Sequence, residues 1–359
     1  MTMNIKLIIL SILMVYYLLT DKNPKAKNRF IVLACALLTI ESGLRGLEIG
    51  PDTHAYYSSF YVIMGTPWNE VFLSLFMPLS EVRDPGYDVI IKLFSTIIPS
   101  WQLYCLASAI FLYVSVGKLW AKYIETKQGV LFAVVLWLAL FDIIALSGMR
   151  QMLTTAIAFY MIPFVEEKRW KIVIPTIALG SMIHVSLLFF IAFIPLSYAH
   201  SSHYKTILLL SIIMVPVIGT YSQQIMAFMA NSMENDYYKG YIEEAEGPKA
   251  YVYVVLCTSL SLFILINYRY LKTAPVFFLT AAVLMTLFVP LILRGGTAIR
   301  IGQYFTVYMM LSLPWINERS RNKSILYLAM ITVLLFSIVS IPSDYVFFWD
   351  SVVPYSFGY

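Results

Sequence analysis

The sequence predicts an all-α polytopic membrane protein. Of its 359 residues, 60% are hydrophobic and only 13% are charged, and the mean hydropathy is +0.77. A soluble core of this length is not so apolar. Apolar runs recur along the whole chain, and most reach the ~17 residues that a helix needs to cross the hydrocarbon layer of a membrane. We therefore expect a single integral membrane domain over residues 1–359.

The apolar runs predict about twelve transmembrane segments. In order along the chain they lie at residues 4–20, 29–44, 101–119, 129–147, 150–165, 172–184, 186–198, 205–222, 251–268, 275–293, 299–316 and 324–342. The first is expected to be a retained helix, because it lacks a small-residue cleavage site. Cys35, Cys105 and Cys257 all fall inside apolar segments and are expected to pack in the core.

The run over 172–198 is expected to be a short re-entrant hairpin. As one helix it would be roughly 40 Å long, which is too long to cross without strong tilt. Basic stretches flank it on both sides, and Gly180 with Ser181 gives a flexible point. The apex near His184 would then lie within the membrane and face a water-filled cavity. A single helix would instead move every later loop to the other side.

The loops predict an orientation. The stretch DKNPKAKNR after the first segment is basic and marks the cytoplasmic side, so the amino terminus is expected outside. Two long outer loops follow from this topology, at about 45–100 and 223–250. The formal charge of +5 includes no basic patch of the kind that binds nucleic acid, so no nucleic-acid partner is expected.

Arginines gather on the predicted outer side, where positive charge is uncommon. They are Arg45, Arg83, Arg150, Arg294 and Arg300. The simplest explanation of these arginines is an anionic ligand bound at the outer surface. The diphosphate of a lipid-linked sugar is a candidate for that ligand. Two of them start helices that begin outside, so free backbone amides and a guanidinium would converge there as an anion site. A snorkelling or salt-bridged arginine is the alternative.

The first outer loop holds two turns that start helices. In GLRGLEIGPDTHAYY, Asp52 suits a helix N-cap, and a helical run of aromatic residues that includes Tyr56 follows as an interfacial belt or a sugar-stacking surface. In RDPGY, Asp84 suits the cap and Pro85 the first helical position. A helix over 86–98 is expected next, too short to cross and therefore interfacial or re-entrant on the outer side.

His184 is the remaining candidate for chemistry. An ionisable group at membrane depth is costly and is more often functional than not, although a hydrogen-bonded structural histidine is the alternative. The loop 223–250 is acidic and rich in tyrosine, which suits a solvated loop or a sugar-binding lid. The chain contains no HExxH, Walker, GxGxxG or GxSxG motif, so neither a metal nor a cofactor is expected.

Several segments together resemble the EpsG-like, Wzy-type polymerases of bacterial surface polysaccharides such as O-antigen, capsule and exopolysaccharide. They are RGLEIGPDTHAYYSSF, RDPGY, SGMRQ, HVS, RGGTAIRIGQYF and VVPYSFGY. Asp84 is a departure, because this family more often has glutamate before Pro-Gly. The resemblance implies a GT-C-like, metal-independent membrane glycosyltransferase at the outer, periplasmic or exterior face of the bacterial cytoplasmic (inner) membrane.

The implied reaction transfers a growing glycan from undecaprenyl diphosphate to a single repeat unit on the same carrier. It needs cations for the leaving diphosphate and a base for the acceptor hydroxyl. The other expected partners are the lipid bilayer, a chain-length regulator protein and a flippase. A base with a pKa near 7 favours His184 as base or acceptor-positioner, and Asp52 is then the acceptor-sugar binder or the alternative base.

The remaining candidates receive binding roles. Arg150, Arg294 and Arg300 are expected to hold the donor diphosphate, and Arg45 the acceptor diphosphate. Arg83, Asp84, Tyr56 and Tyr87 complete the expected substrate-binding set. Three other readings stay open at this stage: a flippase or transporter of lipid-linked sugars, an O-antigen-ligase-type glycosyltransferase, and a membrane O-acyltransferase with a buried histidine.

Overall fold

In this computed structural model the described residues are 5–20, 24–77, 82–199, 203–232, 249–294, 299–320 and 356–358. The predicted segment 324–342 and most of the acidic loop 223–250 lie outside them, as does the side chain of Arg294. The described part is helical throughout, apart from one isolated bridge between Arg45 and Phe357.

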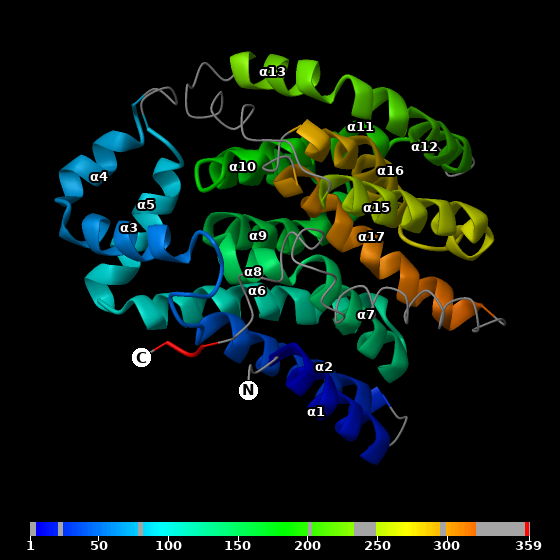
Figure 1. Ribbon diagram of the computed structural model, residues 1–359, viewed down its shortest axis with the longest axis horizontal. Coiled ribbons are helices and arrows are strands. Elements are labelled where there is room, and N and C mark those ends of the chain that lie inside the picture. The colour runs from blue at the N-terminus through cyan, green and yellow to red at the C-terminus, as the bar shows by residue number, and fades with distance from the viewer. Residues whose placement is uncertain are drawn as a thin grey trace. The chain divides into compact units, whose positions relative to one another are not determined.

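The α-helices are named as in Figure 1, and η denotes a 3-10 helix. They are α1 Ile5–Leu19, α2 Pro24–Gly43, α3 Thr53–Gly65, α4 Trp68–Ser74, α5 Pro85–Ile97, α6 Trp101–Tyr123, α7 Lys127–Leu140, α8 Asp142–Ser147, α9 Met149–Glu166, α10 Trp170–Ser181, η1 Val185–Ala192, α11 Phe193–Leu196, α12 Tyr204–Thr220, α13 Ser222–Ser232, α15 Lys249–Ile266, η3 Tyr268–Leu271, α16 Val276–Phe288, η4 Val289–Arg294 and α17 Ile299–Arg319.

Helices occupy every predicted membrane segment within the described residues. By length and apolar composition, two of these helices can each cross a membrane, Trp101–Tyr123 and Val276–Leu293. A third span results if α12 and α13, which meet at an 80° bend, count as one. The other apolar helices among the described residues are shorter or less apolar, so the total of about twelve spans stays a prediction. The described part is nevertheless apolar and all-helical, as a membrane protein is.

The chain, predicted as one membrane domain, divides into two compact units. Unit 1 comprises Met1–Val71, Tyr87–Tyr160 and Leu313–Tyr359, and unit 2 comprises Phe72–Gly86 and Met161–Ser312. In unit 1, α2 packs along α6 and also against α1 and α7 (Figure 1). The contact with α6 is close at Gly43, where an added Cβ would lie 2.9 Å from the Cα of Leu106.

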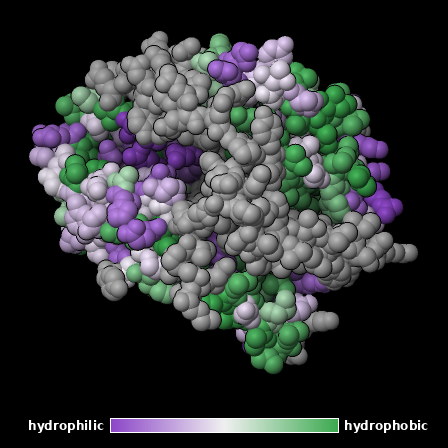
Figure 2. Space-filling model, in the orientation of Figure 1, coloured by the Kyte–Doolittle hydropathy of each residue, from purple (hydrophilic) through white to green (hydrophobic). Residues whose placement is uncertain are grey.

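Buried lysines fasten α1 to the rest of unit 1. The Lys6 ammonium lies 2.5 Å from the Asp142 carboxylate, and Lys127 donates to the Thr20 carbonyl at 2.6 Å. A buried charge needs such partners, because an unpaired one is expensive in an apolar interior. The outer face of α1 is apolar, as the green surface at the lower edge of Figure 2 shows. Its exposed large side chains are Leu7, Ile8, Ile12, Met14, Val15, Leu18 and Leu19.

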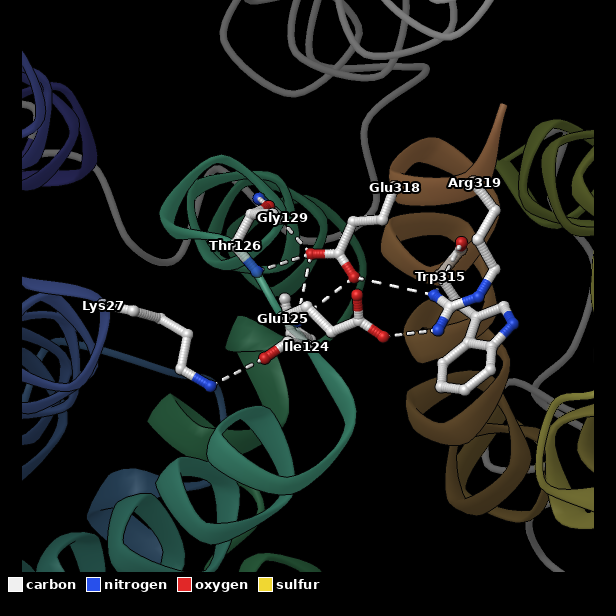
Figure 3. Close-up of polar contacts among 8 residues, drawn as sticks. All are labelled: Lys27, Ile124, Glu125, Thr126, Gly129, Trp315, Glu318 and Arg319. Carbon is white, nitrogen blue, oxygen red and sulfur yellow. Dashed lines mark hydrogen bonds and ion pairs between the residues drawn. The ribbon is translucent and has the colours of Figure 1, made fainter. Parts of the chain in front are cut away.

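Unit 1 has a polar clamp at one end of α2 and α6 (Figure 3). The Glu318 carboxylate accepts hydrogen bonds from the backbone N–H of Thr126 at 2.8 Å and of Glu125 at 3.1 Å. Arg319 pairs with Glu125 at 2.5 Å and stacks on Trp315, 3.5 Å from the ring centroid. The Thr126 hydroxyl caps α7, since it accepts from the Gly129 N–H at 3.0 Å, and it donates in turn to the Glu318 carboxylate at 2.8 Å.

In unit 2, the run over 172–198 is a hairpin, as expected. Helix α10 ends at Ser181, and η1 packs back against α10. The two ends of the run meet, because the Trp170 indole N–H donates to the Tyr198 hydroxyl at 2.6 Å. Residues 182–184 form the apex. That this hairpin enters a membrane stays a prediction.

The rest of unit 2 is a helical bundle. Helix α12 packs against α15 and α16, and the Tyr204 hydroxyl lies 2.9 Å from the Thr280 hydroxyl between α12 and α16. Aromatic side chains of the hairpin pack on α17, with the Phe193 ring 5.7 Å from the Tyr308 ring. The second arm of the hairpin is therefore packed on α17.

Candidate active site

Except for Arg45 and Arg294, the predicted site residues fall into two clusters, one in each unit. The aromatic cluster, in unit 1, consists of Asp52, Tyr56, Tyr87 and Arg150. The histidine cluster, in unit 2, consists of Arg83, Asp84, His184 and Arg300. Each cluster is described below by itself.

In the aromatic cluster, the turn before α3 lies on the start of α9. Gly50 has φ +89, and a Cβ there would lie 2.6 Å from the Leu146 carbonyl oxygen. Only glycine allows both this backbone conformation and this close approach. The Asp52 backbone N–H donates to the Ser147 hydroxyl at 3.3 Å, which fixes the turn on the segment that precedes Arg150. The GPD and SGMR motifs, about a hundred residues apart in the chain, therefore meet.

The interpretation of Asp52 as a capping residue is wrong in part. Asp52 does occupy the N-cap position of α3, but its side chain makes no capping hydrogen bond. Its ψ angle of −2 is not the extended conformation in which a cap side chain normally turns back to the helix.

Arg150 lies against two tyrosine rings. It is the second residue of α9, as predicted, and its guanidinium carbon lies 5.0 Å from the Tyr87 ring centroid and 5.7 Å from that of Tyr56. The two rings are themselves in edge-to-face contact, 5.8 Å apart. Aromatic faces attract a guanidinium and hold its plane, while its N–H groups point along the plane. Such an arginine is preorganised to bind an anion.

Tyr87 adds a proton donor to this cluster. The side chain is fully buried, and its hydroxyl interacts with that of Tyr104, whose ring lies 6.4 Å away. Burial raises the pKa of Tyr87 well above its ordinary value, so the phenol stays neutral at physiological pH.

Arg45 has a different position from the one expected. Its side chain is 1% exposed, and its guanidinium donates to the Ser42 carbonyl and contacts the Met149 sulfur. The C-terminal residues close over the backbone on either side of it, since Gly46 N–H donates to the Ser356 carbonyl at 2.7 Å and Gly358 N–H to the Leu44 carbonyl at 2.9 Å. This geometry suits a structural brace at the end of α2. It does not suit a residue that receives a diphosphate.

In the histidine cluster, the RDPG turn lies across the apex of the hairpin. Helix α5 starts at Pro85, as predicted, and Asp84 before it has φ +53, a left-handed conformation that aspartate tolerates better than most residues. Gly86 N–H donates to the Met182 carbonyl at 2.8 Å, and Val185 N–H to the Asp84 carboxylate at 3.4 Å. The strained backbone thus aims the Asp84 side chain at the apex.

Asp84 and His184 form a buried acid–base pair. The Asp84 Oδ2 lies 3.6 Å from the His184 Nδ1, and their side chains are 1% and 5% exposed. The Arg83 Nε lies 3.4 Å from the same carboxylate oxygen. A carboxylate next to Nδ1 fixes the orientation and tautomer of an imidazole, so that Nε2 can accept a proton. This pairing of Asp84 with His184 was not predicted from the sequence.

Arg300 and Tyr304 complete the histidine cluster from α17. Arg300 is the second residue of α17, and it interacts electrostatically with His184, as does Arg83. One turn later, the buried Tyr304 hydroxyl accepts a hydrogen bond from the Ser186 hydroxyl at 3.2 Å. This bond joins the hairpin apex to α17. In the sequence, Tyr304 could have been noticed because it follows Arg300 by four residues. No sequence pattern, however, pairs Tyr304 with Ser186.

Among the described residues, no group of three or more histidine, cysteine, aspartate or glutamate side chains is arranged to hold a metal ion. Of the predicted arginines, Arg294 lies at the end of η4 with its side chain outside the described part. The reactive and ionic groups of the two clusters therefore include the imidazole of His184 with the carboxylate of Asp84 and the neutral phenol of Tyr87. They also include the guanidinium groups of Arg83, Arg150 and Arg300.

These features define a class of protein: an apolar, all-helical membrane protein with a buried acid–base pair and arginines at helix starts. A family model described as EpsG family matches residues 28–357, and the chain belongs to this family. A comparison with curated proteins and one with solved structures each gave no match. The family suggests polysaccharide biosynthesis and a glycosyltransferase-type polymerase.

Proposed function

We propose that this protein joins oligosaccharide repeat units that are carried on undecaprenyl diphosphate. The growing glycan moves from its carrier to a single repeat unit on a second carrier, and undecaprenyl diphosphate is released. The reaction takes place at the outer face of the bacterial cytoplasmic membrane. Family membership supports the polymerase class, and the arginines at helix starts support an anionic substrate.

The reaction is a substitution at the anomeric carbon of the donor. The acceptor hydroxyl oxygen forms a bond to that carbon, while the bond from the carbon to the diphosphate oxygen breaks. The hydroxyl proton passes to a base, and the diphosphate leaves with its electron pair as an anion. Such a step needs a proton acceptor and positive charge close to each other, because both act on groups attached to one carbon.

The observation that carries the proposal is the composition of the histidine cluster. His184 supplies the base at Nε2, and Asp84, 3.6 Å from its Nδ1, is the positioning residue. Arg83 and Arg300 interact electrostatically with His184. A base flanked by two guanidinium groups is what the donor end of the reaction requires.

The donor diphosphate is accordingly assigned to the histidine cluster. Arg300 lies in the first turn of α17, where a helix N-terminus also favours an anion. Arg83 lies in the turn before α5 with its side chain 22% exposed. Arg294, expected to share this role, precedes the Gly-Gly turn that leads to Arg300, and it stays in the proposal on its sequence position.

A surface-glycan gel tests this function directly. A deletion strain with the wild-type gene on a plasmid is expected to show a ladder of repeat lengths, and the empty plasmid a single-repeat band. The His184→Gln gene is expected to leave only the single-repeat band, with the protein present in the membrane at normal amount. A full ladder from the empty plasmid would overturn the proposal.

A second assay separates a polymerase from a transporter. Membranes that contain the protein receive synthetic lipid-linked repeat units, EDTA and no energy source. Chain growth under these conditions requires an enzyme that works without a divalent metal, whereas a flippase would leave the units unjoined. No growth in the presence of EDTA, with growth restored by a divalent cation, would contradict the metal-independent reaction.

A further inference from the structure

We propose that unit 1 binds the headgroup of an anionic phospholipid where α2 begins and α6 ends. This surface, called the basic end below, consists of the exposed side chains of Lys25, Arg29, Lys118 and Lys122. The inference concerns the contact of the protein with the bilayer and does not depend on the reaction proposed above. Its occupant is a phosphate carried on a lipid, because apolar side chains lead up to the basic end.

Helices α2 and α6 run antiparallel, so the start of one lies beside the end of the other. Near the end of α2, a Cβ added at Gly43 would lie 2.9 Å from the Leu106 Cα near the start of α6. Near the start of α2, the Lys27 ammonium donates to the Ala121 carbonyl at 3.1 Å and to the Ile124 carbonyl at 2.9 Å, the second of which Figure 3 shows. The basic residues of both helices are therefore brought to one end of the pair.

The exposed residues of α2 and α6 also share one side of the pair. In the middle of the contact, a Cβ added at Gly117 would lie 3.5 Å from the Ile31 side chain. On two right-handed helices that run antiparallel, the residues one position after the contact residues turn to the same side. These are Lys118 on α6 and Val32 on α2, and both are exposed. This side is therefore one continuous exposed surface of both helices.

The basic end occupies the last turns of this surface. On α6, Lys122 follows Lys118 by four residues. On α2, Arg29 precedes Val32 by three residues and Lys25 precedes it by seven. Residues at these spacings lie on one face of a helix. The four cations are therefore gathered on one side of the helix pair, at one end.

An apolar stripe on α6 leads to the basic end. Leu103, Ile110 and Val114 are exposed and precede Lys118 at spacings that place them on one face of the helix. Helix α6 is long and apolar enough to cross a membrane by itself. A lipid chain can therefore lie along the stripe while its phosphate meets Lys118 and Lys122. Basic residues at the membrane end of a helix bind anionic headgroups in this way.

The charges around the basic end favour an anion. The carboxylate of Glu125 pairs with Arg319 at 2.5 Å, and that of Glu318 accepts from the start of α7 (Figure 3). The Lys118 ammonium lies over the Tyr160 ring, 4.8 Å from its centroid. An aromatic ring holds an ammonium in place and leaves its N–H groups able to donate to an anion.

Other lysines at this end serve the fold instead. Lys27 donates to the end of α6, and the buried Lys127 donates to the Tyr17 carbonyl at 2.7 Å and to the Thr20 carbonyl at 2.6 Å. Changes at these two positions would remove partners of interior carbonyl groups. The side chains of the basic end are exposed, so they can be changed without opening the interior.

A fluorescent reporter on the apolar stripe tests which lipid lies there. The protein carries Val114→Cys in a background of Cys35→Ala, Cys105→Ala and Cys257→Ala, and it is labelled with bimane in phosphatidylcholine nanodiscs. The nanodiscs contain an equal small share of nitroxide-labelled phosphatidylglycerol or nitroxide-labelled phosphatidylcholine. Both lipids carry the nitroxide on the acyl chain, so they differ only in the headgroup. The quenched fraction of the fluorescence reports how often each lipid contacts the stripe.

Labelled phosphatidylglycerol is expected to quench the reporter severalfold more than labelled phosphatidylcholine at low salt. The difference should shrink at high salt, because ions screen exposed charges. Lys118→Gln with Lys122→Gln should remove most of the difference, and Lys25→Gln with Arg29→Gln the rest. Lys118→Arg with Lys122→Arg keeps the charges and should keep the difference.

The matched control is a reporter at Leu103→Cys, at the other end of the same stripe. It lies about 22 Å from Lys118 along the helix, so the two labelled lipids should quench it equally. Equal quenching of the Val114→Cys reporter by the two lipids would overturn the proposal, and this measurement needs no change in the basic end. So would an equally large difference at Leu103→Cys, or a difference at Val114→Cys that survives the loss of all four cations.

Discussion

The aromatic cluster and the histidine cluster are built in the same way but contain different chemistry. In each, a turn of the loop between α2 and α5 lies on a distant turn: Gly50 on Leu146 in one, Gly86 on Met182 in the other. The first presents a guanidinium fixed by two tyrosine rings, and the second presents an imidazole fixed by a carboxylate. Under the proposed function, neighbouring motifs of one loop contribute to a substrate-binding cluster and to a proton-transfer cluster.

This difference predicts different kinetic effects. Changes in the histidine cluster should slow the chemical step and therefore lower kcat. Changes in the aromatic cluster should weaken one substrate and therefore raise its KM with kcat preserved. A histidine-cluster variant with a raised KM and a normal kcat would contradict this comparison. So would an aromatic-cluster variant with a lowered kcat and a normal KM.

The largest expected effect is that of His184→Gln. Loss of a general base costs about 10²- to 10⁴-fold in rate, and we expect a loss in this range in kcat at saturating substrates. Asp84→Asn keeps the size of the side chain but removes the charge beside Nδ1, so its loss should be smaller. Single-turnover joining of a lipid-linked donor to a lipid-linked acceptor measures both. An Asp84→Asn protein slower than His184→Gln would contradict the assignment of Asp84 as a positioning residue.

The next effect concerns the geometry of the aromatic cluster. Gly50→Ala places a Cβ 2.6 Å from the Leu146 carbonyl at a backbone φ of +89, which should shift the turn away from the start of α9. The KM for the acceptor should rise severalfold, because Arg150 moves with the start of α9. Gly65→Ala is the matched control, because a Cβ there meets nothing within 4 Å. Equal acceptor KM values in the two alanine variants would show that the turn does not position Arg150.

A smaller effect is expected for the hydrogen bond between Ser186 and Tyr304. Ser186→Ala and Tyr304→Phe each remove one partner of a buried contact worth about 0.5–1.5 kcal/mol. If the bond positions His184 relative to α17, each variant should lower kcat severalfold with KM unchanged, and the double variant should be no slower than the slower single one. Fully additive losses would mean that the two hydroxyls act separately.

The smallest effect on activity is expected at the clamp in Figure 3. Glu318→Gln removes the charge that accepts from Thr126 and Glu125 at the start of α7. It should lower the free energy of unfolding by about 1–2 kcal/mol, because hydrogen bonds to a charged acceptor are weakened, and leave kcat and both KM values unchanged. Thermal unfolding in detergent and the joining assay check the two halves of this prediction. A changed KM for the donor or the acceptor would show that the clamp affects substrate binding.

The sequence predicted the helices and the residues at their starts. Hydropathy located the apolar segments within the described part, the Pro85 start of α5 followed from proline geometry, and the hairpin followed from its length and flanks. These features depend on local pattern, which periodicity and turn chemistry report. The positions of Arg150 and Arg300 in the first turns of α9 and α17 were predicted on the same basis.

The pairings between distant residues could not be predicted. Asp84 and His184 are about a hundred residues apart, and no spacing rule connects them. The inward turn of Arg45 depends on Met149 and on the C-terminal residues that close over it, which only the folded chain brings together. The capping interpretation of Asp52 was wrong in part because the turn is fixed instead by Ser147. Local sequence patterns identify candidate site residues, whereas the contacts of each candidate are seen only in the folded chain.

The central claim is that the histidine cluster takes up the proton and holds the donor diphosphate, while Arg150 of the aromatic cluster binds substrate and takes no part in proton transfer. The most direct measurement is the single-turnover rate of joining as a function of the concentration of the lipid-linked repeat unit for wild type, His184→Gln and Arg150→Ala. We predict that Arg150→Ala reaches the wild-type rate when this substrate is raised far enough, and that His184→Gln stays slow at every concentration. A His184→Gln protein that recovers the wild-type rate at high substrate concentration would contradict the account.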